Sequence, residues 1–150
     1  MKIKNIIITF VSAIALLLST STISFAKVVG DKIILGAAVS LTGKYSSNGV
    51  HTQNGYNMAV DRINGMGGVK VGGKSYKFEI IYYDDESNPK RAAQLAERLI
   101  SQDKVEFMLG PYSSGLTKAM APVTEKYGVP MVEANGASRS LFTKGYKYLF

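Results

Sequence analysis

Short apolar segments of strand length alternate with amphipathic helical patterns along most of this chain, and this order restricts its fold more than any other feature. The segment from Ile33 to Val39 is apolar throughout, which is typical of a strand buried on both faces of a sheet. Further strands are predicted at Tyr76 to Tyr83, Val105 to Gly110 and Val129 to Ala134, and another begins at Tyr146. Strands separated by helices predict a parallel sheet flanked by helices, which is a doubly wound α/β fold.

A helix is predicted in each interval between the first four strands. The first, from Asn48 to Asn64, and the second, which begins at Asn88 and Pro89, carry apolar residues on one face. Asparagine is a favoured N-cap, and proline suits the first helical turn. The third helix spans Ser114 to Tyr127, and Pro122 inside it is expected to bend it. The expected buried stripes are Tyr56, Ala59, Val60 and Ile63 in the first helix, and Ala92, Leu95, Ala96, Leu99 and Ile100 in the second.

The first 26 residues have the three-part layout of a secretory signal peptide. A short basic segment precedes an apolar run from Ile6 to Leu18, which is shorter than the roughly 20 residues that a membrane-spanning helix needs. The small residues Ser24 and Ala26 mark the cleavage site. We therefore expect cleavage after Ala26 and a periplasmic mature chain. Because the chain ends on a predicted strand, we expect residues 27–150 to form an incomplete N-terminal α/β lobe.

The charge pattern and the lack of cysteine exclude several classes of function. The formal net charge of +7 falls by two, to +5, when Lys2 and Lys4 leave with the signal peptide. The remaining basic residues are scattered among acidic ones, whereas nucleic-acid binding needs a clustered basic surface. Without cysteine the chain has no disulfide, no thiol nucleophile and no Cys-based metal site.

The stretch GVKVGGKS, from Gly68 to Ser75, matches the Walker A pattern G-x-x-x-x-G-K-[ST] at each specified position. A working phosphate-binding loop follows a buried strand and opens a helix, whose free N–H groups surround the phosphates. Here the stretch follows a predicted helix and leads into the strand that begins at Tyr76. We therefore interpret it as a glycine-rich β-hairpin with Lys74 on a turn, and we predict no nucleotide site.

Three polar loops follow predicted strands, at residues 40–49, 110–115 and 133–140. In open parallel α/β sheets, ligands bind at the carboxyl ends of the strands, where such loops meet. In the first loop, Tyr45 either walls a ligand pocket or covers the core. We expect the binding site of the protein among these three loops.

The second and third loops share a chemistry, because Ser113, Ser114 and Ser138 lie where helices are predicted to begin. Hydroxyl groups together with free N–H groups at a helix start predict a neutral receptor for a carboxylate. The alternative is that these serines only cap their helices. Glycines at positions 110, 115 and 136 are expected to let the ligand approach the backbone closely.

The sequence predicts no catalytic, cofactor or metal site. Neither serine of GPYSSG is flanked by glycines as in the G-x-S-x-G motif of hydrolases. His51, the only histidine, is expected to be an exposed helix residue. The run Asp84, Asp85 and Glu86 is expected to be a solvated turn, because adjacent carboxylates in a strand point to opposite sides and no His or Cys lies near them.

Taken in order, these motifs resemble the N-terminal lobe of type I periplasmic binding proteins of ABC transporters, in the branched-chain amino-acid group. ILGAAVSLTGKYSSNG resembles the first strand and ligand loop of that family, and YDDESNP resembles the end of its next strand. The most specific stretch is GPYSSGLTKAMAPVTEKYGVPMVEANGAS. The resemblance covers nearly all of residues 27–150, and the family's second lobe lies outside them. Some members carry a cysteine pair in this lobe, which this chain lacks.

The resemblance implies an exported, monomeric receptor without a cofactor, which captures an amino acid or similar small molecule and delivers it to an ABC permease. A ligand-sensing ectodomain of a signalling receptor with the same lobe is the alternative, and an extracytoplasmic hydrolase is a third. Aliphatic amino acids, aromatic acids, amides and urea-like compounds all remain open as ligands. The ligand contacts that the resemblance implies are Ser114, Gly136 through its carbonyl, and Ser138, with Ser113 and Ala137 beside them and Tyr45 or Asn48 as a wall.

Overall fold

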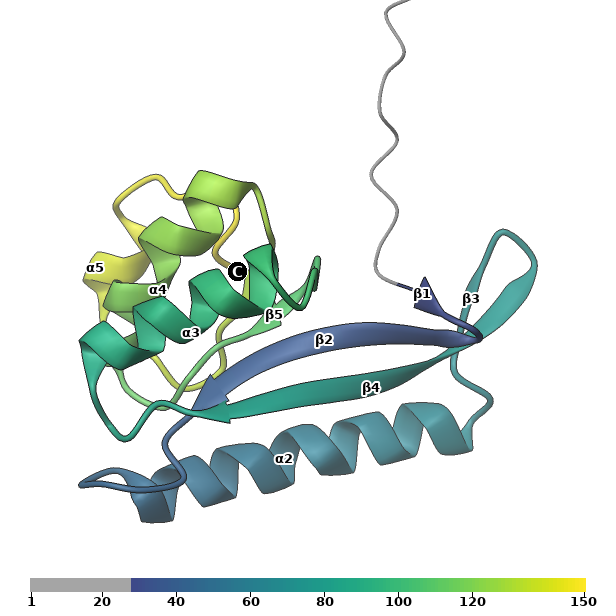
Figure 1. The fold of residues 1–150 in the computed structure, drawn as a ribbon, viewed down its shortest axis with the longest axis horizontal. Helices are drawn as coiled ribbons and strands as arrows, with labels where there is room; N and C mark the ends of the chain where they lie inside the picture. Colours follow the sequence, from purple (N-terminus) through teal and green to yellow (C-terminus); the bar gives the residue numbers. More distant parts are fainter. Residues whose placement is uncertain (1–27) are drawn as a thin grey trace, which may run out of the picture.

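The computed structural model describes residues 28–150, so the predicted signal peptide lies outside the described residues. Figure 1 shows a curved sheet with helices on both faces. The strands are β1 (Val28–Val29), β2 (Lys32–Val39), β3 (Val69–Val71), β4 (Lys74–Asp84), β5 (Met108–Leu109) and β6 (Met131–Val132). The helices are α2 (Ser46–Gly65), α3 (Pro89–Ser101), α4 (Ser114–Tyr127) and α5 (Arg139–Phe142).

The sheet has the strand order β3-β4-β2-β5-β6, with β1 paired to β2 off this path. Neighbours among β4, β2, β5 and β6 are parallel, while β1 and β3 pair antiparallel. In this register Ala37 at the centre of β2 lies opposite Tyr82 on one side and Leu109 on the other. The predicted doubly wound α/β fold is therefore confirmed.

Strands β5 and β6 are shorter than predicted because their first residues form hydrogen bonds to helix ends. The backbone N–H of Val105 donates to Leu99 O of α3, and that of Val129 donates to Thr124 O of α4. Pro130 has no N–H, so β6 begins at Met131. The predicted last strand is found beside β6, where Met131 and Leu149 form a parallel bridge.

Helices α3 and α4 cover one face of the sheet and form the core with it (Figure 1). The Asn88 side chain caps α3 by accepting hydrogen bonds from Lys90 N and Arg91 N, as predicted. The whole predicted stripe of α3 is buried, against Leu116 and Met120 of α4 among others. Helix α4 continues through Pro122, which is exposed, so the proline does not end the helix.

Helix α2 lies on the opposite face and differs from its prediction (Figure 1). It begins at Ser46, and only Gly49 and Thr52 are buried, while Ala59 of the expected stripe is exposed. The reason is that α2 packs mainly on β4 and β2, so part of this face of the sheet is left uncovered. A groove of about 300 Å³ on this face is lined by apolar residues, including Ile33, Leu35, Phe78, Phe107, Leu109 and Val132.

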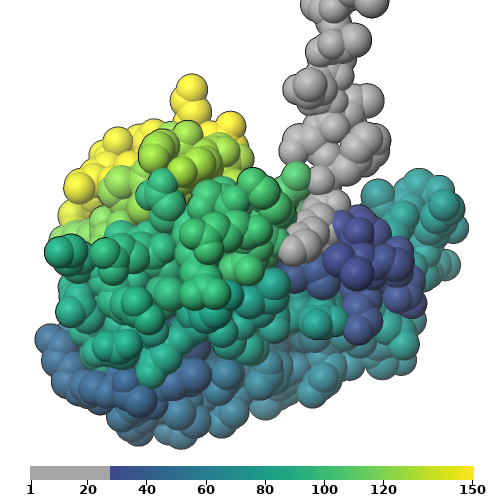
Figure 2. Space-filling model, viewed as in Figure 1, coloured from purple at the N-terminus to yellow at the C-terminus, as the bar shows by residue number. Residues whose placement is uncertain are grey.

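The Walker-like stretch forms the hairpin that the sequence predicts. Val69 pairs with Tyr76 and Val71 with Lys74, and positive φ angles at Gly72 and Gly73 turn the chain between them. Figures 1 and 2 show this hairpin projecting from the end of the molecule that lies away from α3 and α4. Lys74 begins β4 and leads into no helix, so the phosphate-binding geometry is missing. Within residues 28–150, no helix combines the length and hydrophobicity that crossing a membrane requires.

Candidate functional site

The loops that follow β2, β5 and β6 meet at the carboxyl ends of these three neighbouring parallel strands. The first leads into α2, the second into α4 and the third into α5. This is the edge at which the sequence predicts binding, and it lies at the opposite end of β4 from the hairpin (Figure 1). The geometry of each loop decides which of its polar groups are free for a ligand.

Asp84, at the end of β4, holds the first loop in place. Its Oδ1 accepts hydrogen bonds from Leu41 N at 2.9 Å and Thr42 N at 3.2 Å, and its Oδ2 accepts one from Thr42 Oγ1 at 2.7 Å. Ser87 adds a second tie, since its Oγ donates to Thr42 O and accepts from Tyr45 N. Burial acts to raise the pKa of Asp84, but hydrogen bonds from Thr42, Glu86 and Leu41 outweigh it and lower that pKa.

The expectation of a solvated turn at residues 84–86 is wrong for Asp85, which is fully buried. Its Oδ1 accepts from Ser40 Oγ at 2.6 Å and from Ser87 N at 2.8 Å, while Oδ2 is buried with no hydrogen-bond partner among the described residues. Burial raises the pKa of Asp85, and the two hydrogen bonds oppose this only in part. These carboxylates therefore have a structural role. Asp84 holds the backbone of the first loop, and Asp85 holds Ser40 at the start of that loop. Among the described residues, no group of three or more His, Cys, Asp or Glu is placed to hold a metal ion.

The second loop brings Ser113 and Ser114 to the start of α4, as predicted. Ser113 is the N-cap, and its Oγ accepts a hydrogen bond from Leu116 N at 3.4 Å. Its φ of 85° lies in the left-handed region, which is unusual for a residue with a side chain. The N–H groups of Ser114 and Gly115, in the first turn, have no hydrogen-bond partner among the described residues. This helix start therefore keeps the free donors that a carboxylate requires.

Ser114 and Ser138, which the sequence analysis placed in one site, are in direct contact. The backbone N–H of Ser138 donates to Ser114 Oγ at 3.0 Å, so the second and third loops are joined. Ser138 Oγ lies 2.8 Å from Ser140 Oγ and makes no capping bond to α5. Ala137 beside it is exposed. Ser113 is thus a helix cap, whereas Ser114 and Ser138 connect two loops.

The third loop differs from the predicted receptor, because the N–H groups of Asn135 and Gly136 are not free. Glu133 Oε1 accepts hydrogen bonds from Asn135 N at 2.5 Å and Gly136 N at 2.6 Å, and Glu133 Oε2 accepts from Thr117 Oγ1 at 2.6 Å. Burial raises the pKa of Glu133, and these three hydrogen bonds oppose that rise. These two N–H groups of the third loop are therefore bonded within the protein, whereas those of Ser114 and Gly115 in the second loop have no partner among the described residues.

Two of the three loop glycines also have a different role from the one expected. A Cβ at Gly110 would overlap Glu133 Oε2, and a Cβ at Gly136 would come within 3.1 Å of Glu133 Cδ. These glycines make room for a side chain of the protein, and Gly136 is itself buried. Gly115 alone is open, since the nearest atom to a Cβ there would be 4.0 Å away.

A hollow of about 380 Å³ lies between the amino-terminal half of α2 and the second and third loops. Asn48, His51 and Tyr112 line it, and no hydrogen bond to their side chains is found among the described residues. His51 is exposed, as predicted. Tyr45 packs on the core, which is one of its two predicted roles. It does not line the hollow itself, but its ring meets that of Tyr112 edge-on at 5.6 Å.

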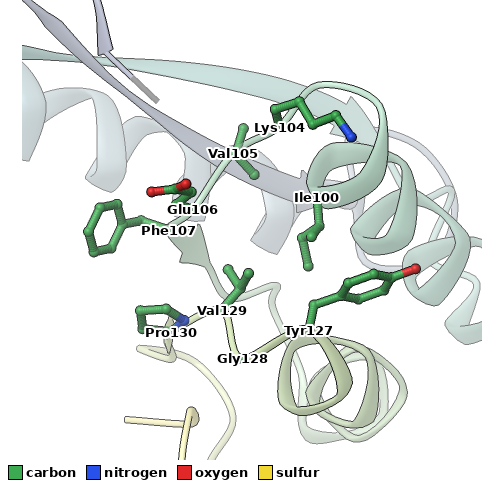
Figure 3. Close-up of a pocket in the computed structure, with 9 residues that line it drawn as sticks. All are labelled: Ile100, Lys104, Val105, Glu106, Phe107, Tyr127, Gly128, Val129 and Pro130. Atoms are coloured by element: carbon green, nitrogen blue, oxygen red, sulfur yellow. The ribbon is translucent and has the colours of Figure 1, made fainter. Parts of the chain in front are cut away.

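A second hollow, of about 400 Å³, lies at the amino ends of β5 and β6 (Figure 3). Its lining comes from the end of α3 and from the segments that enter the two strands, including Ile100, Val105, Tyr127 and Val129. This edge is opposite to the three loops. None of the residues that the sequence analysis placed at a ligand site lines it.

Sequence reasoning missed the site roles of Glu133, Thr117, Tyr56 and Tyr112. Tyr56 OH donates to Gly110 O at 2.7 Å, and burial raises the pKa of this tyrosine. The local sequence identifies Tyr56 only as a member of an apolar helical stripe and Glu133 only as an acid that follows an apolar strand. Neither pattern reveals a hydrogen-bond partner far away along the chain. The acid directly after the apolar segment VPMV was the one available signal.

The model of the family described as "periplasmic binding protein" matches residues 32–150. The leucine-, isoleucine-, valine-, threonine- and alanine-binding protein of Pseudomonas aeruginosa is 30% identical over 120 residues, which are 80% of this chain and 31% of that protein. The chain thus spans about a third of the length of such relatives.

Two solved structures share the fold and have different ligands. The branched-chain amino acid transporter substrate-binding protein LivJ of Streptococcus pneumoniae, in complex with isoleucine, has a TM-score of 0.71 and 34% identity, covering 79% of this chain and 33% of that one. A solute-binding protein of an ABC transporter from R. palustris, in complex with 4-hydroxybenzoate, has a TM-score of 0.64 and 34% identity, covering 79% and 31%. Both relatives are binding proteins with a carboxylate ligand.

Proposed function

The chain belongs to the periplasmic binding protein family, and we propose that it is the N-terminal lobe of an extracytoplasmic receptor for an amino acid or a similar small carboxylate. In this proposal the protein captures its ligand outside the cytoplasm and delivers it to the permease of an ABC importer. It catalyses no reaction. The signal peptide is cleaved after Ala26, and the mature receptor acts as a monomer.

The observation that carries the proposal is the start of α4. The N–H groups of Ser114 and Gly115 are free among the described residues, and the Ser114 hydroxyl, which accepts from Ser138 N, keeps its proton for a ligand. Three donors at the positive end of a fourteen-residue helix suit a carboxylate. The relatives with isoleucine and 4-hydroxybenzoate support this, because both ligands carry a carboxylate.

The hollow beside this helix start supports a site for the rest of the ligand. Its lining includes Asn48, His51, Tyr56 and Tyr112. In the proposal, Ser114, Ser138 and Gly136 hold the charged groups of the ligand, with Ser113 and Ala137 beside them. Asn48 lines the hollow, and Tyr45 supports its wall through the ring contact with Tyr112.

Isothermal titration calorimetry of the full chain against a panel of ligands tests the proposal. The panel contains aliphatic and aromatic amino acids, benzoates, amides and urea, and we expect at least one carboxylate to bind with a 1:1 stoichiometry. Binding of ATP with no response to any carboxylate would contradict the proposal. A pull-down of the protein with the permease subunits of candidate ABC importers tests the transport step separately.

A further inference from the structure

The groove of about 300 Å³ on the α2 face of the sheet is lined by apolar residues alone. Ile33 and Leu35 of β2 are the buried part of this lining. Phe107 and Val132, by contrast, are 40% and 54% exposed, so the groove presents large apolar side chains to water. Contiguous apolar surface of this kind marks a place where another segment or molecule binds.

A second apolar hollow, of about 470 Å³, adjoins the groove and shares Ile33 and Phe107 with it. Val28 also lines this hollow and is 44% exposed. Val28 pairs with Ile33 in the antiparallel pair of β1 and β2, and directly opposed residues point to the same face of a sheet. Because Val28 is the first described residue, the chain enters the described structure at the rim of this apolar surface.

The segment that precedes Val28 contains the apolar run from Ile6 to Leu18. The residues between Leu18 and Val28 span about 35 Å when they are extended, which is long enough to place the run on the adjoining groove. The run contains no Asp, Glu, Lys or Arg, and neither does the lining of the groove. The run therefore matches the groove in polarity and is tethered beside it.

We propose that the apolar run from Ile6 to Leu18 docks in this groove as long as residues 1–26 remain attached. Docking removes apolar surface of both partners from water, and the tether keeps the run at a high effective concentration. Cleavage after Ala26 then uncovers the groove. The inference goes beyond the proposed function, because it concerns the uncleaved chain and involves no ligand.

Disulfide formation tests this contact, because the chain contains no cysteine and an introduced pair has no competitor. Ser12→Cys lies in the middle of the apolar run, and Val132→Cys lies in the groove. Phe142→Cys is the matched control: Phe142 is 52% exposed, but it belongs to α5, which packs on α4, and it does not line the groove.

Cell-free synthesis without membranes supplies the full chain with residues 1–26 still attached. Under mild oxidation, we expect Ser12→Cys to form a disulfide with Val132→Cys at least about tenfold faster than with Phe142→Cys. Both partner positions are exposed, so the substitutions remove little packing, and thermal melting shows that each variant is folded.

Charges placed in the run separate docking from chance contact. Val11→Asp combined with Ile14→Asp would bring carboxylates into an apolar groove, which is unfavourable without partners. We expect these two changes to slow the disulfide at Val132→Cys at least about tenfold, to the rate of the Phe142→Cys control. Thr20→Asp combined with Thr22→Asp puts the same charges outside the run and should leave the rate unchanged.

Equal rates for Val132→Cys and Phe142→Cys would overturn the inference, and so would a rate that is insensitive to the aspartates in the run. A disulfide that joins two chains through Val132→Cys would assign the groove to a second copy and would overturn it as well. Sedimentation of the oxidised chain distinguishes this dimer from the disulfide within one chain. None of these measurements involves the ligand panel, so the proposed function is decided by its own test.

Discussion

The backbone N–H of Ser138 donates a hydrogen bond to Ser114 Oγ across 3.0 Å, which joins two loops that follow neighbouring strands. The hydroxyl group of Ser114 therefore accepts from the protein and can donate its own proton to a ligand. The same hydroxyl belongs to the first residue of α4, next to the free N–H groups of the helix start. One side chain thus both assembles the site and contacts the ligand in the proposal.

Ser114→Ala removes this hydroxyl. We expect the affinity for the ligand to fall by about 1.5–3 kcal/mol, because a hydrogen bond to a charged group is lost and Ser138 N is left without its acceptor. Calorimetry measures the change. Lys74→Ala, in the hairpin at the other end of β4, is the control and is expected to leave the affinity unchanged. Equal affinities for Ser114→Ala and the wild type would remove Ser114 from the site.

Ser113 tests the strain at the start of α4. Its φ of 85° is a conformation that glycine adopts readily, and its capping bond to Leu116 N is long, at 3.4 Å. We expect Ser113→Gly to be more stable than Ser113→Ala by about 1–2 kcal/mol, because both variants lose the capping hydroxyl but only alanine keeps the backbone strain. Urea unfolding of both variants measures the difference. Alanine and glycine variants of equal stability would show that this backbone is not strained.

Gly49 is the position where α2 approaches the first loop most closely. A Cβ there would overlap the carbonyl oxygen of Ser40, which is backbone and cannot move aside without shifting the end of β2. We expect Gly49→Ala to lower the free energy of unfolding by about 1–3 kcal/mol. At Gly55, in the same helix, a Cβ would meet nothing within 4 Å, so Gly55→Ala should raise stability by about 0.5–1 kcal/mol. The midpoint temperatures of thermal unfolding of the two variants should therefore shift in opposite directions from that of the wild type.

Asp84 and Asp85 are adjacent, and we expect them to affect the pH dependence of stability in opposite ways. The pKa of Asp84 is lowered on folding, so its contribution is present above its unfolded pKa and is lost as the pH falls through the folded one. The pKa of Asp85 is raised, so its contribution is present below its unfolded pKa and is lost as the pH rises through the folded one.

The asparagine variants separate the two effects. As the pH rises from about 3 to about 7, Asp84→Asn should become progressively less stable than the wild type, and Asp85→Asn progressively more stable relative to it. The amide side chain in Asp85→Asn retains an oxygen to accept from Ser40 Oγ and Ser87 N, the two hydrogen bonds of Asp85 Oδ1. Chemical denaturation at several pH values gives, for each variant, the slope against pH of its stability difference from the wild type. Slopes of the same sign would contradict the assignment of Asp85 as a buried, disfavoured charge.

Much of the fold was predictable because it depends on contacts within a few residues. The stripe of α3 is buried as a whole, since its period of 3.6 residues places every member on the face that meets the sheet and α4. The cap at Asn88 and the hairpin at Gly72 and Gly73 follow from local backbone chemistry. The stripe of α2 was predicted by the same rule and is only half-buried, because the sheet beneath it offers too little cover.

The sequence by itself determined the order of strands and helices, and therefore the edge of the sheet where the three loops meet, because parallel strands align their carboxyl ends. Only the tertiary structure decided which groups of these loops are joined by hydrogen bonds. Ser114 and Ser138 are 24 residues apart, Thr117 and Glu133 are 16 apart, and Ser40 and Asp85 are 45 apart. A hydrogen bond depends on distance and direction between two groups, and no local periodicity encodes either for residues so far apart along the chain. The hydrogen bonds from Asn135 N and Gly136 N to the Glu133 carboxylate were likewise decided by the tertiary structure.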